Sequence, residues 1–467
     1  MTYLWVILIY LVILLVIGGW RSRQVKSKDD FAVAGRKLSA PVLVGTLLAT
    51  WIGSGSILAS AGLAYREGFP ALWFDAGVWV ALIVLYFIAG RARKLAQYTV
   101  PDLLEMRYNK YARILGTIVT VIAYTAIVSY QIRAGGIVLK LVAGIDEETG
   151  RIITAVFVVG YTVLAGLISV VYTDVVNGVI MIIGLVITLP FLIQTGNGWN
   201  AVISRLPETH LQLLGRLSLT QAIGYALPTM LLLLGESGMY QRFFSARDGR
   251  TARKAVVGWI AGTIIIETLI VVIAVVGSSI FTDISSENVI LVSVKEALPL
   301  AAGCLALAAI VAVIVSTADS FLLVPATNLL RDVVQRFIWP DMSEQRFVFL
   351  SRVAVIVLGL LAYAQLSLFR NVLEMALYAY TMYGVGITPA VMAAFFWKRA
   401  TAAGGVTGIG GGMVATLVWE LGGLAESTGV NTVYAALAVS VVGLVAVSLL
   451  TKAPGKQQVE PFFQSGV

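Results

Sequence analysis

Hydroxyl and carboxylate side chains gather at two places inside long apolar segments of this chain. One is the run from Ser316 to Ser320, and the other is the run from Tyr172 to Asp174. Their oxygen atoms are ligands of the kind that a hard cation prefers. A monovalent cation needs several oxygens but few formal charges, and one helical turn bearing Ser316, Thr317 and Ser320 would supply them. The alternative is that these hydroxyl groups bond back to their own helix, while the carboxylate of the first run caps or pairs near its end.

Two further apolar segments contain groups of glycine and serine at mid-length. The first covers residues 49–56, Ala-Thr-Trp-Ile-Gly-Ser-Gly-Ser, and the second covers residues 235–238, Gly-Glu-Ser-Gly. Such a group predicts an interrupted helix, with backbone carbonyl and amide groups that lipid cannot satisfy. Carbonyl groups released at the first break would add to the hydroxyl oxygens of the 316–320 run. The alternative is two ordinary packing faces of small residues.

The elements that must position these residues are membrane-spanning helices. The chain has 467 residues, of which 59% are hydrophobic and 12% charged, whereas soluble domains carry about 25% charged residues. Apolar runs of about 20 residues are long enough to cross about 30 Å of hydrocarbon. They predict an all-α polytopic membrane protein with about thirteen spans. The predicted spans are 3–20, 40–64, 71–90, 114–143, 151–170, 173–194, 219–244, 254–281, 301–325, 348–367, 372–396, 402–422 and 431–451.

The basic residues predict an orientation in the membrane. Most of the 33 Lys and Arg residues stand in loops that follow odd-numbered spans, including Arg242 after the seventh, while the opposite loops are short or acidic. Because Lys and Arg mark cytoplasmic loops, we expect a cell-membrane protein with its N-terminus outside and its C-terminus in the cytoplasm. The net charge of +8 then reflects topology, and no nucleic-acid partner is expected. A single Cys and a single His exclude a disulfide scaffold and a Cys/His metal cluster.

The two breaks open two blocks of five spans that run in opposite directions through the membrane. Equivalent breaks of this kind predict an inverted-repeat secondary transporter whose binding site lies near the midplane. The predicted segments are 1–39 (first span and basic loop), 40–194 (first repeat), 195–218 (exterior loop), 219–396 (second repeat), 397–451 (two further spans) and 452–467 (a cytoplasmic tail, expected to be disordered).

These motifs resemble those of the sodium/solute symporter family, which includes proline, sialic acid, glucose and choline carriers. The resemblance covers essentially the whole chain and is most specific at residues 172–175, 315–320 and 240–245. It implies the five-plus-five inverted-repeat fold of the leucine transporter, with Na+ as the coupling ion. The first break, residues 48–55, is most similar to the choline-carrier branch, in which a Trp follows Ala-Thr. The aromatic residue of that branch in span seven has no counterpart at residues 236–238.

The resemblance also implies a main sodium site with five ligands. Ala49 and Ile52 would donate backbone carbonyl groups at the first break, and Val313 would donate one in span nine. Ser316 and Thr317 would donate hydroxyl groups.

Some relatives resemble a two-sodium arrangement, and a second site would here use Asp174 with Ser316 and Ser320. Asp319 stands where such a relative has Ser. Its carboxylate would strengthen the second site, rearrange it or bind a proton.

The breaks also suggest a class of solute. If Trp51 and Glu236 face one midplane cavity, the indole face would attract a cation and the buried carboxylate would need a positive partner. This favours an amine, an amino acid or a quaternary amine. Alternatively, Glu236 caps the broken helix or pairs with Arg133, and Trp51 only seals the cavity. Further predicted solute contacts are Ser54, Tyr124, Gln131, Ser237 and Tyr383.

Together these features favour a sodium-coupled symporter of a small organic solute that works by alternating access. Its expected partners are the solute, Na+ and the bilayer, and it is expected to function as a monomer without enzymatic activity. The alternatives are sodium-coupled carboxylate or sugar uptake, or a proton-coupled symporter that uses Asp174 or Asp319. A channel would need a continuous polar lining, and an enzyme would need a nucleophile–base pair or metal ligands. Glu267, in the middle of span eight, must pair or be protonated, whereas Asp75 is expected in solvent.

Overall fold

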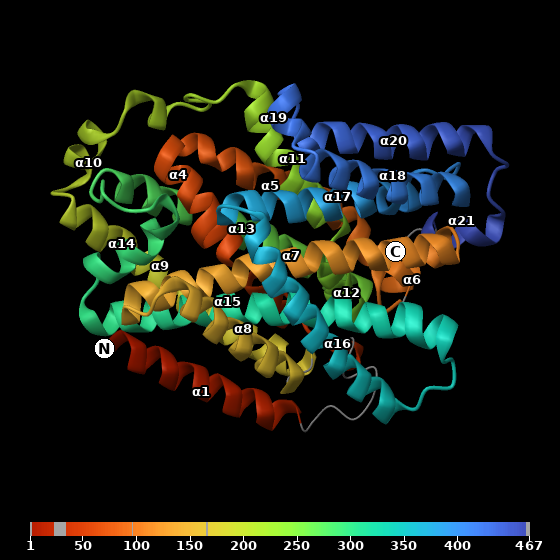
Figure 1. Ribbon diagram of the computed structural model, residues 1–467, viewed down its shortest axis with the longest axis horizontal. Coiled ribbons are helices and arrows are strands. Elements are labelled where there is room, and N and C mark those ends of the chain that lie inside the picture. Colours follow the sequence, from red (N-terminus) through yellow and green to blue (C-terminus); the bar gives the residue numbers. More distant parts are fainter. Residues whose placement is uncertain (1, 23–33, 96, 165–166, 464–467) are drawn as a thin grey trace.

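Helices are the only regular secondary structure in the part of the chain that the structure describes. The computed structural model describes residues 2–22, 34–95, 97–164 and 167–463, and the side chains of residues 167–174 are outside that description. Most of the helices run side by side along one direction (Figure 1). In lipid a helix satisfies the hydrogen bonds of its own backbone, which explains why long apolar segments take this form.

Long apolar helices stand where the sequence predicted membrane spans. Ten helical segments of the described residues are long and apolar enough to cross a membrane, and a bent pair makes an eleventh. Helices α1 and α8, with 21 and 18 residues, fall outside that count and stand at the positions of the first and fifth predicted spans. The spans are α1 (Thr2–Ser22), α3 with η2 and α4 (Ala40–Trp51, Gly55–Ser60 and Ala61–Glu67), α5 (Leu72–Leu95), α7 (Lys110–Ala143), α8 (Glu147–Leu164), α9 (Leu167–Thr195), α11 with α12 (Leu219–Gly235 and Ser237–Ser245), α13 (Gly249–Ser278), α15 with η6 (Leu300–Asn328 and Leu329–Ile338), α16 (Glu344–Gln365), α17 (Val372–Phe396), α18 (Ala402–Leu421) and α20 (Thr432–Leu450).

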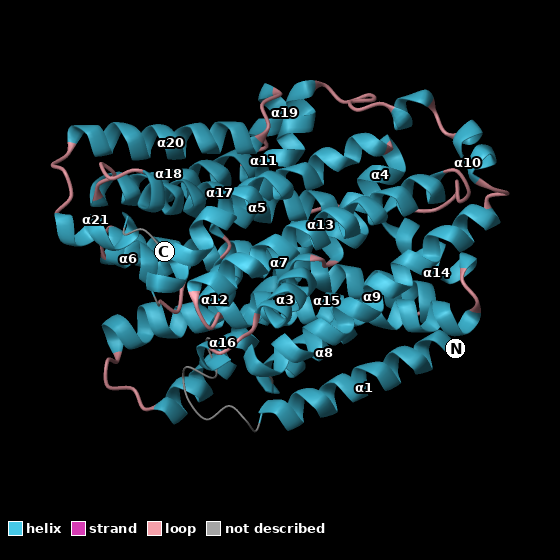
Figure 2. Ribbon diagram, turned by 180° about the vertical axis from the view of Figure 1, so that it is seen from behind, coloured by secondary structure: helices cyan, strands magenta, loops and turns pink. Residues whose placement is uncertain are grey.

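Shorter helices cover the two ends of this bundle. They are α6 (Val100–Arg107), α10 (Trp199–Arg205), α14 (Val289–Ala297), α19 (Leu424–Thr428) and α21 (Lys456–Phe463), with single turns at Ala34–Arg36, Phe69–Ala71, Glu208–Leu211, Ser286–Asn288 and Leu366–Leu368. Both views place α10 and α14 at one end and α6 and α21 at the other (Figures 1 and 2). Helix α1 lies on one flank of the bundle, and α18 and α20 lie together on the opposite flank.

Both predicted helix breaks are present. Helix α3 ends at Trp51, Ile52 has extended backbone angles (φ −80°, ψ 98°), and the axis of α4 is bent by 52° from that of α3. Helix α11 ends at Gly235, and Glu236 (φ −61°, ψ 117°) separates it from α12. Groups of glycine and serine therefore interrupt these two spans, as the sequence predicted.

The C-terminal segment differs from its prediction. Residues 456–463 form helix α21 instead of a disordered tail. The side chain of Phe462 is fully buried and meets the ring of Phe395 edge-on, with ring centroids 5.5 Å apart. Burial of one aromatic side chain stabilises such a contact by roughly 2–3 kcal/mol, an interaction that the polar composition of the segment does not reveal.

Candidate functional site

The first break lies against span nine, where the sequence placed a cation site. A Cβ atom built on Gly53 would lie 3.0 Å from the Oγ1 atom of Thr317 and 2.9 Å from the Nε2 atom of Gln131. A larger residue at position 53 would have to displace these two side chains, so glycine lets the broken backbone lie close to them. Both atoms are buried, and neither has a hydrogen-bond partner among the residues that the structure describes. An unpaired buried hydroxyl or amide group costs about 1–3 kcal/mol, so these atoms are available to a ligand.

The other residues predicted for the main sodium site are also buried. Ala49 is the third-last residue of α3, and Ile52 is the first extended residue after that helix. Val313 and Ser316 lie on α15, within one turn of Thr317. The donor set of backbone carbonyl and hydroxyl oxygens has the chemistry that a monovalent hard cation needs. The unpaired Thr317 hydroxyl is the feature of this region that fits such an ion.

One residue predicted for a second sodium site, Ser320, lies beside a guanidinium group. Ser320 and Asp319 are buried on α15, and the Nη2 atom of Arg242 lies 3.4 Å from the Oγ atom of Ser320. The side chain of Asp174 lies outside the described residues. A fixed positive charge beside Ser320 repels any further cation at that place.

Arg242 itself corrects the sequence analysis, which counted it among the loop residues of the basic face. Its side chain is 1% exposed and lies on α12 inside the bundle. It donates hydrogen bonds to the hydroxyl groups of Thr46 (3.1 Å) and Thr50 on α3, and to the carbonyl group of Gly238 (3.1 Å). Arg242 thus joins the two broken spans to each other and to α15. Its position was the signal, because residue 242 lies within the predicted span 219–244, four positions after the Gly-Glu-Ser-Gly group.

The indole group of Trp51 contacts a second buried cluster. Its Nε1 atom donates to Glu267 over 2.8 Å, and that of Trp79 donates to the other carboxylate oxygen over 2.8 Å. The Trp51 ring stacks on Tyr380 with centroids 6.5 Å apart. Glu267 is therefore paired, as one of the two expectations held. Asp75, which was expected in solvent, is 1% exposed and accepts a hydrogen bond from Ser60 over 2.8 Å.

Glu236 caps the second broken helix. Its carboxylate accepts hydrogen bonds from the backbone N–H groups of Gly238 (2.9 Å) and Met239 (2.5 Å) and from the hydroxyl of Tyr124. A carboxylate at a helix N-terminus is stabilised by the free N–H groups and the helix dipole. The sequence left helix capping open as the alternative to solute binding at Glu236. Two other predicted solute residues also form hydrogen bonds within the protein at this break. Ser237 donates its backbone N–H to Tyr124 over 2.8 Å, and Tyr383 donates to the carbonyl of Gly235 over 2.8 Å.

The predicted solute residues thus form two groups along α7. Gln131 belongs to the first group, where its Oε1 atom accepts from the hydroxyl and the N–H of Ser54 at 2.7 and 3.2 Å. Tyr124 belongs to the second group, beside Glu236. Gln131 and Tyr124 are seven positions apart on this α-helix, which corresponds to a rise of about 10 Å. Tyr130, which precedes Gln131 on α7 and was also expected as a solute contact, has its hydroxyl 3.1 Å from that of Tyr380.

An ion-pair network closes the end of the bundle at α6. Arg113 of α7 contacts Asp102 (2.6 Å) and Glu105 of α6 and Asp332 (2.5 Å) of η6. Although burial acts in the opposite direction, the guanidinium groups of Arg113 and Arg336 hold the pKa of Glu105 below its ordinary value. The network therefore ties α6 to α7 and to η6, the continuation of span nine.

Comparisons with known proteins identify the family and the fold of the chain. The sequence model of the sodium:solute symporter family matches residues 31–412. The chain belongs to the sodium:solute symporter family. Its relatives include the osmoregulated proline transporter OpuE of Bacillus subtilis, which is 27% identical over 96% of this chain and 94% of that protein. The sodium/proline symporter of Staphylococcus aureus is 26% identical over 97% of this chain and 93% of that protein.

Solved structures show the same fold. A Na+-coupled sialic acid symporter in a substrate-bound outward-open state superposes with a TM-score of 0.80, at 18% identity, over 97% of this chain and 98% of that one. Mhp1, a nucleobase-cation-symport-1 family transporter, superposes with a TM-score of 0.63, at 12% identity, over 94% and 99%. The chain is thus a multi-pass membrane protein with the five-plus-five inverted-repeat fold and a sodium:solute symporter.

Proposed function

We propose that this symporter uses a sodium gradient to take up a small amino acid by alternating access, with one sodium ion bound between the first break and α15. The observation that carries this proposal is the pair of buried, unpaired polar atoms beside Gly53, Thr317 Oγ1 and Gln131 Nε2. One is an oxygen suited to a cation, and the other is an N–H donor suited to a carboxylate. An amino acid and Na+ together supply both partners.

The proposed sodium ligands are those that the family resemblance implied. They are the carbonyl groups of Ala49, Ile52 and Val313 and the hydroxyl groups of Ser316 and Thr317. Their support is the extended backbone at Ile52 and the burial of all five residues.

One ion per cycle is proposed because Arg242 occupies the neighbourhood of a second site. Its guanidinium group lies beside Ser320 and carries a permanent charge. We therefore expect sodium-dependent uptake with a Hill coefficient near one. Ser320→Ala should leave the sodium concentration for half-maximal uptake within about twofold, whereas Ser316→Ala should raise it about tenfold or more, as for loss of a contact to a charged group. A Hill coefficient near two, reduced by Ser320→Ala, would show a second ion at Asp174, Asp319 and Ser320.

The proposed solute is an amino acid of the class named in the relatives, proline. Gln131 Nε2 would donate to its carboxylate, and the ring of Trp51 would lie along its apolar part, with Ser54 orienting Gln131. The second broken helix would be held in place by a separate group of residues, Glu236, Ser237, Tyr124 and Tyr383. An organic cation finds less support, because Glu236 already accepts three hydrogen bonds within the protein.

Gln131→Glu separates these solute classes. The variant keeps an acceptor oxygen for Ser54 but replaces the amide donor with a second oxygen, which repels a carboxylate and attracts a cation. In proteoliposomes, the KM for proline should rise at least about tenfold, as expected for loss of a hydrogen bond to a charged group. Improved uptake of choline-like amines by this variant would favour the organic-cation alternative. Uptake of only sugars or monocarboxylates by the unaltered protein would contradict the amino-acid proposal.

The remaining proposals concern topology and the coupling ion. We propose that the end with α6 and α21 is cytoplasmic and the end with α10 and α14 is exterior, because the basic loops gather at the former. The proposed repeats are residues 40–194 and 219–396, in a functional monomer without enzymatic activity. Full uptake driven by a proton gradient without Na+ would support the proton-coupled alternative instead.

A further inference from the structure

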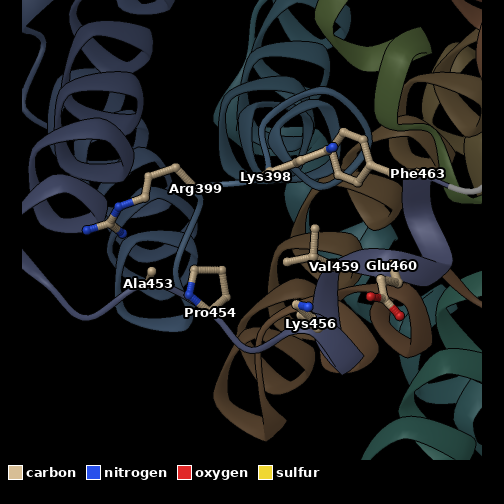
Figure 3. Close-up of a pocket in the computed structure, with 8 residues that line it drawn as sticks. All are labelled: Lys398, Arg399, Ala453, Pro454, Lys456, Val459, Glu460 and Phe463. Carbon is tan, nitrogen blue, oxygen red and sulfur yellow. The ribbon is translucent and has the colours of Figure 1, made fainter.

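A cavity of about 620 Å³ lies beside the C-terminal helix α21, at the end of the bundle that carries α6. Three cationic side chains line it, Lys398 and Arg399 from the loop after α17 and Lys456 from the start of α21. Its only lining carboxylate among the described residues is that of Glu460. Figure 3 shows these residues around the cavity, with the amine of Lys398 directed at the ring of Phe463.

The loop that carries two of these cations is held rigidly. Arg107 donates to the carbonyl groups of Trp397 and Lys398, each over 3.2 Å. Arg399 donates to the carbonyl groups of Leu449 and Thr451 at the end of α20 through one guanidinium nitrogen, Nη2, while its buried Nη1 atom has no partner within the described part of the chain. The cations are therefore gathered by tertiary contacts, and part of their hydrogen-bonding capacity is unused.

The surroundings of the cavity place it at the level of lipid headgroups. Phe396 ends α17 two residues before Lys398, and Leu449 and Leu450 end α20. These side chains are 52%, 60% and 86% exposed. Large apolar side chains exposed at the ends of spanning helices face hydrocarbon, and the adjacent charged residues then meet the headgroups. Val459 and Phe463 of α21 add an apolar wall to the cavity.

We propose that this cavity binds the headgroup of an anionic phospholipid of the adjacent leaflet, with its phosphate between Lys398, Arg399 and Lys456. Basic pockets at the membrane surface bind such headgroups through charge and hydrogen bonding. The acyl chains extend along Phe396, Leu449 and Leu450. The excess of cations over carboxylates selects an anion. The continuity with lipid-facing side chains selects a lipid over a soluble anion.

A bound headgroup links two parts of the protein. Lys398 lies 5.2 Å from the ring centroid of Phe463, and Phe462 is packed on Phe395 at the end of α17. A phosphate between the α17 loop and Lys456 therefore fastens α21 to the end of α17. The inference concerns lipid binding only, so it does not depend on the proposed solute or on the number of sodium ions.

The test compares thermal stability and lipid affinity of the purified protein in mixed micelles. Phosphatidylglycerol should raise the melting temperature, whereas phosphatidylcholine, inorganic phosphate and glycerol phosphate should not. Lys398→Gln/Arg399→Gln/Lys456→Gln should weaken phosphatidylglycerol binding about tenfold or more, given the contribution of each basic residue near a membrane surface. The control Arg247→Gln/Arg250→Gln/Lys254→Gln removes three charges from the connection before α13 and from its first turns, none of which lines the cavity, and should retain the binding.

Glu460→Gln provides a second variant that does not remove a contact of the proposed phosphate. It should tighten phosphatidylglycerol binding, because it removes the one carboxylate that repels the headgroup. Equal responses to phosphatidylglycerol and phosphatidylcholine, or equal losses in the two triple variants, would overturn the proposal. An equal response to inorganic phosphate would identify a soluble-anion site and overturn it as well.

Discussion

The Thr317 hydroxyl offers the sharpest test of the sodium site. Removing it should not lower the stability of the sodium-free protein but should weaken sodium binding. Its Oγ1 atom is buried beside Gly53 and has no hydrogen-bond partner in the described part of the structure. Thr317→Val has nearly the same shape and removes only this hydroxyl group. Without Na+, the variant should be as stable as the unaltered protein or up to about 3 kcal/mol more stable, because an unsatisfied buried hydroxyl costs about 1–3 kcal/mol.

In the presence of Na+ the same substitution should weaken binding of the ion. A hydrogen-bond-like contact to a charged group contributes about 1.5–3 kcal/mol. Since about 1.4 kcal/mol corresponds to a factor of ten, the sodium concentration for half-maximal uptake should rise about 10- to 150-fold. Apparent solute affinity at fixed Na+ should fall as well, since ion and solute binding are reciprocally coupled. Thr317→Ser, which keeps the hydroxyl group, should stay close to the unaltered protein.

The assay combines sodium-dependent uptake in proteoliposomes with thermal unfolding in NaCl and in KCl. Thr263→Val is the matched control, because Thr263 on α13 is also fully buried and its Oγ1 atom is also unpaired within the described residues. It should change stability equally in both salts and leave the sodium dependence unaltered. A Thr317→Val variant with unchanged half-maximal sodium concentration, or the same sodium shift in Thr263→Val, would refute the assignment.

Three further predictions test other parts of the structure. Trp79→Phe should lower the free energy of unfolding by about 1–3 kcal/mol more than Trp259→Phe, because it leaves one carboxylate oxygen of Glu267 without its donor. The indole nitrogen of Trp259 has no partner in the described chain, and equal losses in thermal unfolding would contradict this prediction. Burial raises the pKa of Glu287, so the folded chain binds a proton at this carboxyl group more readily than the unfolded chain does. The free energy of unfolding should therefore fall as the pH rises from the ordinary carboxyl pKa through the raised one. Glu287→Gln should remove this part of the pH dependence in unfolding measurements. The third test uses a chain without its native cysteine. A cysteine in place of Asp283 should react with an impermeant thiol reagent added to intact cells, whereas one in place of Arg250 should not. The reverse pattern would overturn the proposed orientation.

The sequence was sufficient for the features that depend on neighbouring residues. Runs of about 20 apolar residues determine where helices cross the membrane, and the glycine and serine groups at 49–56 and 235–238 determine where two of them break. The position of Thr317 among apolar residues marked it as a polar group that needs a partner. These properties are local, because the backbone of each spanning segment satisfies its own hydrogen bonds.

The partners of the buried charged groups were decided by the tertiary structure. Trp51 and Glu267 are 216 positions apart in the chain, and no periodicity in either segment indicates that they meet. Arg242 looked like a loop residue until the packing of α12 against α3 enclosed it. The docking of α21 depends on one buried ring, Phe462. Each of these contacts joins helices that are remote in sequence, and the free energy of a buried charge depends on which groups the packing brings within hydrogen-bonding distance.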